Sequence, residues 1–505
     1  MLFAHGQSEP IFDGSGGTIP PVPTRLTALD SSFLHLEDQG AHMHIAALLL
    51  FDGVAPDYEE LCRSLEHHLE RAPRYRQRLA TVPLGQGRPC WVDDIHFNMH
   101  YHLRHTAVPA PGGERQIQDL CARLLSQRLD RHRPLWEMWL IEGLQDGGFA
   151  MLTKSHHALV DGVGGMDVIG LLLSSDPDER APAGHPAWQP EPTPTGVELL
   201  ADALRERAIS PSEIARGVRR VTRRPRRTLA AAGGFARSIG SLVAGGLQPA
   251  PRTPLNVPIG QHRRYTWIDA DLARFKTIKN ELGGTVNDVV LASVALGLGA
   301  WMRERGRRTE HLVLRAMAPV SVRPQSSRDG SGGNRVAAMW VPLPVGIPDA
   351  AECLTAIREQ TAQIKHGGQA VGAEHLTELA NFAPPTILGQ ATRLQPRQRF
   401  FNLVVTNIPG PQRPLYLLGR PLRRVFPVVP LAQNLALGVA IVSYNGHIGY
   451  GLTGDFDALP DLDEIAGHFA AAIEALADAA GCPAGSGRFA RTSTPPARPP
   501  RRRRR

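Results

Sequence analysis

The first part of the chain alternates between apolar runs of strand length and stretches with apolar residues at helical spacing. His44–Phe51 is a short apolar run, which predicts a buried strand. Tyr58–Arg71 places three leucines four residues apart and ends just before Pro73, which predicts an amphipathic helix. Further helices are predicted at Glu114–Leu129 and Val163–Leu173, and further strands at Trp136–Glu142 and Phe149–Ser155.

The same mixture returns in the second part of the chain, after a stretch rich in proline. Strands are predicted at Arg264–Ile268, Leu312–Val320, Arg335–Val341, Phe401–Val405, Leu435–Ser443 and His447–Thr453. Helices are predicted at Asp271–Glu281, Val286–Trp301, Ala351–Lys365 and Leu462–Ala477. Because strands and helices mix in both halves, the pattern predicts two α/β or α+β domains.

Composition shifts divide the chain into five predicted segments. The start is rich in Gly, Pro and Ser without a period, and the middle combines many prolines with arginine runs and alanine-rich stretches. The segments are a flexible extension (1–24), an N-terminal domain (25–175), a basic connection (176–260), a C-terminal domain (261–480) and a disordered Arg/Pro tail (481–505).

The overall composition is that of a soluble globular protein. The chain has 505 residues, of which 42% are hydrophobic and 21% are charged, and this length favours more than one domain. The densest apolar run, Ile45–Phe51, is too short to span a membrane, and we read no secretory signal at the N-terminus. Five scattered cysteines, none in a CxxC pair, favour neither a disulfide framework nor a zinc site. We therefore expect a cytoplasmic protein.

One short segment combines residue types that can do acid–base chemistry. Ser155-His156-His157-Ala158-Leu159-Val160-Asp161-Gly162 lies between a predicted strand and a predicted helix, where a side chain can project into a cleft. A histidine there can exchange a proton near neutral pH, and the glycine can adopt a turn geometry that other residues avoid. The alternative is structural, with Asp161 capping the next helix. No metal site is indicated, because the motif offers two ligands and no obvious third.

These residues, with five other short segments, resemble a known family. His156-His157-x-x-x-Asp161-Gly162 is similar to the signature of the CoA-dependent acyltransferase superfamily, which includes chloramphenicol acetyltransferase and condensation domains. The other segments occur in the expected order: Leu29-Asp30-x-x-Phe33-Leu34, Pro134-Leu135-Trp136, Asn287-Asp288, Gly333-Asn334 and Asn407-Ile408-Pro409-Gly410-Pro411. Together, over about residues 26–477, they resemble the bacterial wax ester synthase/diacylglycerol acyltransferase family, and its mycobacterial triacylglycerol synthases most closely.

The resemblance implies a fold and a reaction. The fold is α/β with mixed α+β character: two chloramphenicol-acetyltransferase-like domains, joined by a long helical connection, share a tunnel with His157 near its middle. The reaction moves a long-chain acyl group from acyl-CoA to the hydroxyl of diacylglycerol, giving triacylglycerol and CoA. Acyl-CoA is a co-substrate, and no permanently bound cofactor or metal is expected. The alternatives are a wax ester synthase that uses a long-chain alcohol, and a catalytically silent condensation-like scaffold.

The resemblance also assigns roles within the motif. His157 is the general base, His156 supports it by packing, Asp161 anchors the loop through an ion pair, and Gly162 makes the turn. Because a thioester is already activated, no covalent acyl-enzyme is required. The base must reach the acceptor hydroxyl to within about 3 Å.

Two further segments have open interpretations. Asn287 could donate to the oxyanion or to the acceptor, or it could belong to the N-terminal cap of a long apolar helix. Pro134-Leu135-Trp136 has no titratable group and is expected to shape the site. Asn407-Ile408-Pro409-Gly410-Pro411 is typical of a rigid turn after a strand.

Other reaction classes lack their motifs, and the charge distribution suggests a lipid surface. The sequence contains no G-x-S-x-G, no Walker A lysine motif, and no G-x-G-x-x-G after a strand. Two arginine runs, at 205–237 and 483–505, each carry a net charge of +8, while the rest of the chain is net acidic; neither run has the interleaved aromatics of a nucleic-acid-binding protein. The first run also has apolar residues at interfacial helical spacing, which predicts peripheral association with the inner face of the membrane or with lipid inclusions. An ordinary solvated pair of interdomain helices is the alternative.

Overall fold

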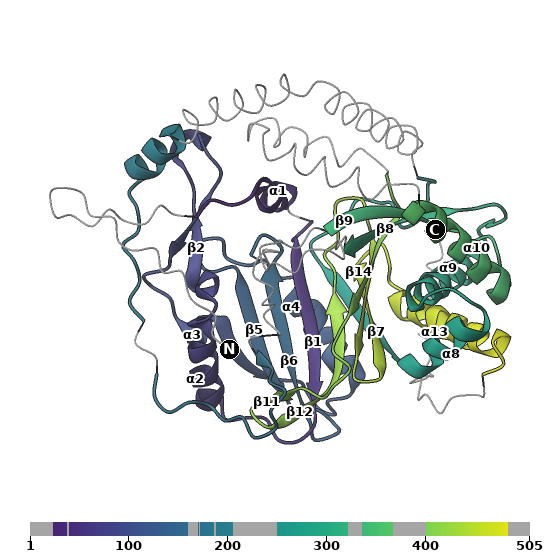
Figure 1. Cartoon of the computed structure of the whole chain (residues 1–505), viewed down its shortest axis with the longest axis horizontal. Coiled ribbons are helices and arrows are strands. Elements are labelled where there is room, and N and C mark those ends of the chain that lie inside the picture. Colours follow the sequence, from purple (N-terminus) through teal and green to yellow (C-terminus); the bar gives the residue numbers. More distant parts are fainter. Residues whose placement is uncertain are drawn as a thin grey trace, which may run out of the picture.

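The chain forms two six-stranded sheets that lie side by side, each with helices packed on it (Figure 1). The computed structural model describes residues 24–37, 40–159, 170, 172–185, 188–205, 250–321, 336–366 and 400–482. Most of the predicted helix Val163–Leu173, the extension, the arginine run of 206–237 and nearly all of the tail lie outside the described residues.

The first sheet has the strand order β11-β12-β1-β6-β5-β4 and is antiparallel except between β4 and β5. Its strands are β1 (His44–Phe51), β4 (Leu103–Ala107), β5 (Trp136–Glu142), β6 (Phe149–His156), β11 (Tyr416–Leu417) and β12 (Arg420–Val428). The helices of this half are α1 (Ala28–Leu36), α2 (Tyr58–Leu69), α3 (Met99–His102) and α4 (Glu114–Leu125), with two short 3-10 turns, Pro73–Arg76 and Pro83–Gly85. The strands β2 (Gln77–Ala80) and β3 (Cys90–Asp93) form a small, separate antiparallel hairpin.

Alternation along β1 explains why helices pack on both faces of this sheet. Leu48 and Leu50 belong to the buried cluster formed with α4, whereas Leu49 and Phe51 belong to the cluster formed with α1 and α2. Successive residues of a strand point to opposite faces, so a run that is apolar at every position is buried on both sides.

The second sheet has the order β7-β14-β13-β10-β8-β9. Its strands are β7 (Arg263–Asp271), β8 (Leu314–Ser321), β9 (Val336–Leu343), β10 (Leu403–Pro409), β13 (Leu437–Tyr444) and β14 (His447–Asp455). Its helices are α8 (Leu272–Glu281), α9 (Val286–Glu304), α10 (Ala350–His366) and α13 (Leu462–Ala479), which group at one side of this sheet in Figure 1. The apolar helix α9 lies against α8, α10 and α13, which accounts for its burial on nearly every side.

A strand from the second half completes the first sheet. β12 pairs with β1 from Ala46↔Val428 to Phe51↔Leu422, and it also contacts β13 and β14 of the second sheet. The approach is close at Gly451, where an added Cβ would lie 1.7 Å from the carbonyl oxygen of Pro427. Tyr265 of β7 donates its hydroxyl to Phe426 O at 3.0 Å. The two halves are therefore joined by shared pairing and by a glycine contact.

The predicted helices and strands that fall within the described residues are found, most of them with shifted ends, and three differences are informative. α4 ends at Leu125 rather than Leu129; Lys154 Nζ donates to Leu124 O and Gln127 O there, at 3.2 Å each. The turn predicted at residues 407–411 is wrong for its first three residues, which form the end of β10 and pair in parallel with β13. β12 was not predicted, because its two prolines and three arginines hide the alternation of a strand.

No single described helix is long and apolar enough to cross a membrane. Only α8 and α9 together meet the length and composition of a span, as a pair bent by 96°, and α9 is largely buried in the core of the second half. The predicted domain boundaries near residues 175 and 260 stay a prediction.

Gly451→Ala should destabilise the protein by about 1–3 kcal/mol, because a methyl group there meets backbone that cannot move aside. Urea denaturation of purified protein measures the change. The control is Gly467→Ala in α13, where an added Cβ has no neighbour within 4 Å. This control should be neutral or more stable by about 0.5–1 kcal/mol. Equal stability of the two variants would contradict the close sheet contact.

Candidate active site

The two histidines of the motif lie at the end of β6, where the backbone is held from both sides. His156 is the last residue of the strand and pairs with His44 of β1. The amide of His156 donates to Leu135 O at 2.9 Å, and the amide of His157 donates to Met43 O at 2.8 Å. Leu135 belongs to the Pro134-Leu135-Trp136 segment, so this segment positions the motif through its backbone.

The imidazole of His157 stacks on the ring of Phe33 in α1. The ring centroids are 4.0 Å apart and the planes are inclined by 24°. Burial lowers the pKa of His157, and this effect outweighs a contact with its own backbone that raises it. The ring is therefore neutral at pH 7, the form in which it can accept a proton.

His156 is buried, with 1% of its surface exposed, and its ring has a defined tautomer. The amide of Ala158 donates to Nδ1 of His156 at 3.0 Å, so Nδ1 acts as an acceptor. A neutral histidine that accepts at Nδ1 carries its proton on Nε2. Nδ1 of His156 is thus held by the backbone of the following turn, and these surroundings suit the supporting role expected of it.

The remaining motif residues, Asp161 and Gly162, lie outside the described residues. The roles expected for them as anchor and turn stay predictions. The sequence reasoning did not anticipate the buried ion pair that the structure shows two residues before His156.

Lys154 of β6 is fully buried and contacts Glu137 of β5. Lys154 Nζ lies 3.1 Å from Glu137 Oε2, and Arg104 lies 3.1 Å from Glu137 Oε1. Burial lowers the pKa of Lys154, although Glu137 opposes this effect. Because the same ammonium group donates to the carbonyls at the end of α4, it ties β5, β6 and α4 together below the histidines.

Asn287 and Asn407, from two separate sequence segments, contact each other. Asn407 Nδ2 at the end of β10 donates to Asn287 Oδ1 in the first turn of α9, at 3.2 Å. Asn287 is not the helix cap, because Thr285 fills that position. Thr285 Oγ1 accepts from the amide of Asp288, and Asp288 Oδ2 accepts from the amide of Thr285. No hydrogen bond joins Asn287 to either histidine within the described residues.

A small cavity of about 20 Å³ lies where the two halves meet, next to the backbone that holds His157. Its lining includes His42, Met43 and His44 before and at the start of β1, Arg263 of β7 and Val428 of β12. The cavity therefore has both cationic or titratable groups and apolar walls. Among the described residues, no group of three or more His, Cys, Asp or Glu side chains could hold a metal ion.

Comparison with known proteins shows the family of the chain. Residues 26–290 match the wax ester synthase/diacylglycerol acyltransferase catalytic domain, and residues 332–477 match the WS/DGAT C-terminal domain. The chain belongs to the wax ester synthase/diacylglycerol acyltransferase family. This confirms the resemblance found in the sequence, and with it the assignment of the chain to the acyltransferases.

Individual relatives cover nearly the whole chain. A putative diacylglycerol O-acyltransferase of Mycobacterium tuberculosis, Rv1760, is 34% identical over 494 residues, which are 94% of this chain and 93% of the relative. The probable diacylglycerol O-acyltransferase tgs1 of the same species is 35% identical over 446 residues, 87% of this chain and 93% of the relative.

Solved structures confirm the predicted fold. The wax ester synthase/diacylglycerol acyltransferase of Marinobacter aquaeolei VT8 is 30% identical, with a TM-score of 0.65 over 91% of this chain and all of that chain. The starter condensation domain of rhizomide synthetase is 12% identical, with a TM-score of 0.54 over 91% of this chain and 94% of that domain. This second likeness shows that condensation domains share the two-half architecture.

The pH dependence of kcat/KM should reveal the lowered pKa of His157. A general base works in its neutral form, so a pKa below the ordinary value of 6.5 keeps the enzyme active as the pH falls through 6.5. We expect the acid limb to have its midpoint below 6.5, with thermal unfolding recorded at each pH to exclude denaturation. A midpoint above 6.5 in folded protein would contradict the assignment of His157 as a buried neutral base.

Proposed function

We propose that this enzyme transfers a long-chain acyl group from acyl-CoA to the hydroxyl of diacylglycerol, which releases triacylglycerol and CoA. The observation that carries the proposal is the half-buried His157 imidazole, stacked on Phe33 directly after β6, in a chain of this family. The names of the relatives Rv1760 and tgs1 favour diacylglycerol as the acceptor.

The chemistry requires one base and one acid, and His157 can act as both. The imidazole removes the hydroxyl proton as the oxygen attacks the thioester carbonyl, so a new C–O bond forms and the carbonyl oxygen becomes negative. When the carbonyl reforms, the C–S bond breaks and the thiolate of CoA takes the proton from the imidazolium. No redox step and no covalent acyl-enzyme enter this sequence. The base contributes about 10²–10⁴-fold to the rate.

Asn287 is our proposed donor to the developing negative charge or to the acceptor. Its Oδ1 accepts from Asn407, and this contact fixes which end of the Asn287 amide is the donor. An uncharged amide donor needs no titration and stays active at any pH. The hydrogen bonds of the α9 cap run between Thr285 and Asp288, which supports a role for the Asn287 amide beyond capping. Asp161 and Gly162 keep the anchoring and turning roles that the family motif gives them.

A long-chain alcohol is the second candidate acceptor. The solved wax ester synthase/diacylglycerol acyltransferase of Marinobacter aquaeolei VT8 matches this chain over most of its length. Both acceptors present one hydroxyl on an apolar body, and His157 would act on either in the same way.

We further propose that the enzyme binds lipid surfaces peripherally, because its acceptor is insoluble in water. The described helix 196–205 places Leu199 in a buried cluster with the β2–β3 hairpin. Its other apolar residues, Val197, Leu200, Ala201 and Leu204, follow the i, i+3, i+4, i+7 spacing of a second stripe. Val197 is 77% exposed and Leu204 is 52% exposed.

The exposed stripe continues onto a neighbouring turn and is followed in sequence by the arginine run. Gly196 approaches the ring of Pro83, so the helix lies beside the turn that carries Leu84. Leu84 is 84% exposed and has a φ of 57°, which is unusual for leucine. Residues 205–237 supply ten arginines, which favours a surface with anionic lipid headgroups.

His157→Ala should lower kcat by about 10²–10⁴-fold while the protein keeps its melting temperature. The assay offers acyl-CoA with diacylglycerol and a long-chain alcohol together, follows CoA release, and identifies the ester product in a lipid extract. The control is His96→Ala, an exposed histidine, which should leave kcat unchanged. Near-full activity of folded His157→Ala would remove His157 from the mechanism. Wax ester as the main product would favour the second acceptor, and no CoA release from the unaltered enzyme would favour a silent scaffold.

Flotation with anionic vesicles should show reversible binding that weakens at high salt. Changing Leu84, Val197 and Leu204 together to asparagine should reduce the bound fraction, and so should neutralising Arg223, Arg224, Arg226 and Arg227 and deleting residues 483–505. The matched control is Val54→Asn, which alters an equally exposed valine on another loop. Unchanged flotation of these variants would show that neither the stripe nor the arginines anchor the enzyme.

A further inference from the structure

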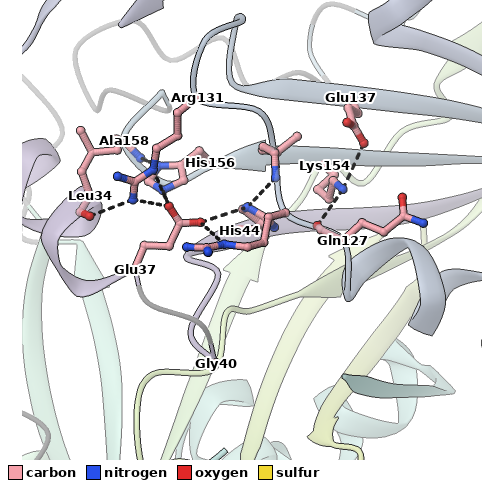
Figure 2. Close-up of polar contacts among 12 residues, drawn as sticks. Leu34, Glu37, Gly40, His44, Gln127, Arg131, Glu137, Lys154, His156 and Ala158 are labelled. Atoms are coloured by element: carbon pink, nitrogen blue, oxygen red, sulfur yellow. Dashed lines mark hydrogen bonds and ion pairs between the residues drawn. The ribbon is translucent and has the colours of Figure 1, made fainter. Parts of the chain in front are cut away.

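Glu37, directly after α1, has a buried carboxylate at the back of the histidine motif. Its side chain is 2% exposed. A buried carboxylate is unfavourable unless charged or hydrogen-bonding partners surround it. Figure 2 shows that such partners converge on it from β1, β6 and the segment after α4.

Each carboxylate oxygen of Glu37 faces one arginine and one histidine. Oε2 accepts from Arg131 Nε at 2.8 Å and lies 3.7 Å from His156 Nε2. Oε1 lies 3.8 Å from Arg128 Nε and 3.7 Å from His44 Nε2. The four groups thus enclose the carboxylate without a second acid among them.

The charges around Glu37 keep it ionised. Burial raises the pKa of Glu37, but His156 and Arg131 together outweigh burial and hold the pKa below its ordinary value. Burial also lowers the pKa of His44 well below its usual range, so His44 is neutral beside it. The cluster is therefore an ionised carboxylate balanced by guanidinium groups, with the neutral imidazole of His44 beside it.

The tautomer of His156 links this cluster to the motif. Because Nδ1 of His156 accepts from the amide of Ala158, its proton is on Nε2, the atom that faces Glu37. The ring of His156 is thus fixed between the turn that follows it and the negative carboxylate. His157 lies within that turn, and its amide donates to Met43 O.

The second link runs through α1. Glu37 ends this helix, and its amide donates to Phe33 O at 3.1 Å. Arg131 contacts the Glu37 carboxylate and also donates to Leu34 O at 2.9 Å. The same contacts that hold Glu37 therefore fix the helix end that carries Phe33, on which His157 stacks.

We propose that Glu37 is a positioning residue for the general base: its buried carboxylate joins His156 and the end of α1, and it thereby holds the His157 ring between Phe33 and the β6 turn. Glu37 does not touch substrate and acts through His157. The inference rests on the proposed acyl transfer and adds a residue that the motif does not contain.

A double-mutant cycle with His157 tests this role. Glu37→Gln keeps the size of the side chain and removes its charge. It should lower kcat by about 10–100-fold with KM changed less than about threefold, because a small misplacement of a catalytic group is costly. In the His157→Ala background the same change should lower the residual rate less than about twofold, since a residue that acts through His157 has nothing left to position. Equal losses in both backgrounds, or a loss confined to KM, would overturn the proposal.

Two controls separate positioning from general destabilisation. Glu474→Gln removes another arginine-bound carboxylate, in α13, where Glu474 Oε2 accepts from Arg274 at 2.8 Å, and it should leave kcat unchanged. Phe33→Leu removes the ring on which His157 stacks and leaves the Glu37 carboxylate unchanged. It should lower kcat as Glu37→Gln does, and its effect should likewise nearly disappear in the His157→Ala background. If Glu37→Gln does not fold, Phe33→Leu and Arg131→Gln test the same link, and full activity in both would overturn it. An unaltered enzyme that releases no CoA would instead refute the proposed function.

Discussion

The site depends on the burial of charge beside the end of β6. Lys154 and His156 point to the same face of this strand, and each is matched to a carboxylate, Glu137 and Glu37. If its partner were removed, either buried carboxylate would lower the stability of the folded protein by several kcal/mol. Lys154 also binds carbonyls at the end of α4, and Arg131 joins Glu37 to the end of α1. These contacts fix the end of β6, and His157 is the next residue of the chain. The end of the strand is thus held by polar contacts, and it is followed directly by His157, the proposed general base.

The same region is where the two halves are joined. β12 comes from the second half of the chain and pairs with β1 of the first half. Gly451 lets β14 approach β12 closely, so β1 is held by both halves. Met43 precedes β1; its carbonyl accepts from the amide of His157, and the residue also lines the cavity between the halves. The position of His157, the proposed base, is therefore tied to the junction of the two halves. A shift of one half against the other would move the cavity wall and the base together.

Local pattern predicted most of the fold and the place of the histidine motif at the end of a strand, but not the contacts that join distant segments. His44–Phe51 and Trp136–Glu142 were predicted with the bounds that the structure shows, because each is a continuous apolar run. Glu37 could not be assigned, since nothing in the periodicity around residue 37 shows that it meets His156. The pairing of Asn287 with Asn407 likewise depends on how β10 and α9 meet in space. Asn287 was open to a capping interpretation because only geometry shows that Thr285 is the cap.

The burial of His157 affects the two halves of the reaction in opposite directions. A lowered pKa makes the imidazole a weaker base toward the alcohol, which is a cost in the first step. It also makes the imidazolium a stronger acid, and the group that must be protonated next is a thiolate whose conjugate acid has a pKa near about 8.5. The proton is therefore passed on readily, and the buried cation is short-lived. In the proposed reaction the imidazolium must give its proton to the CoA thiolate, so a low imidazolium pKa helps the second step. This favours a packed position for His157 over an exposed one.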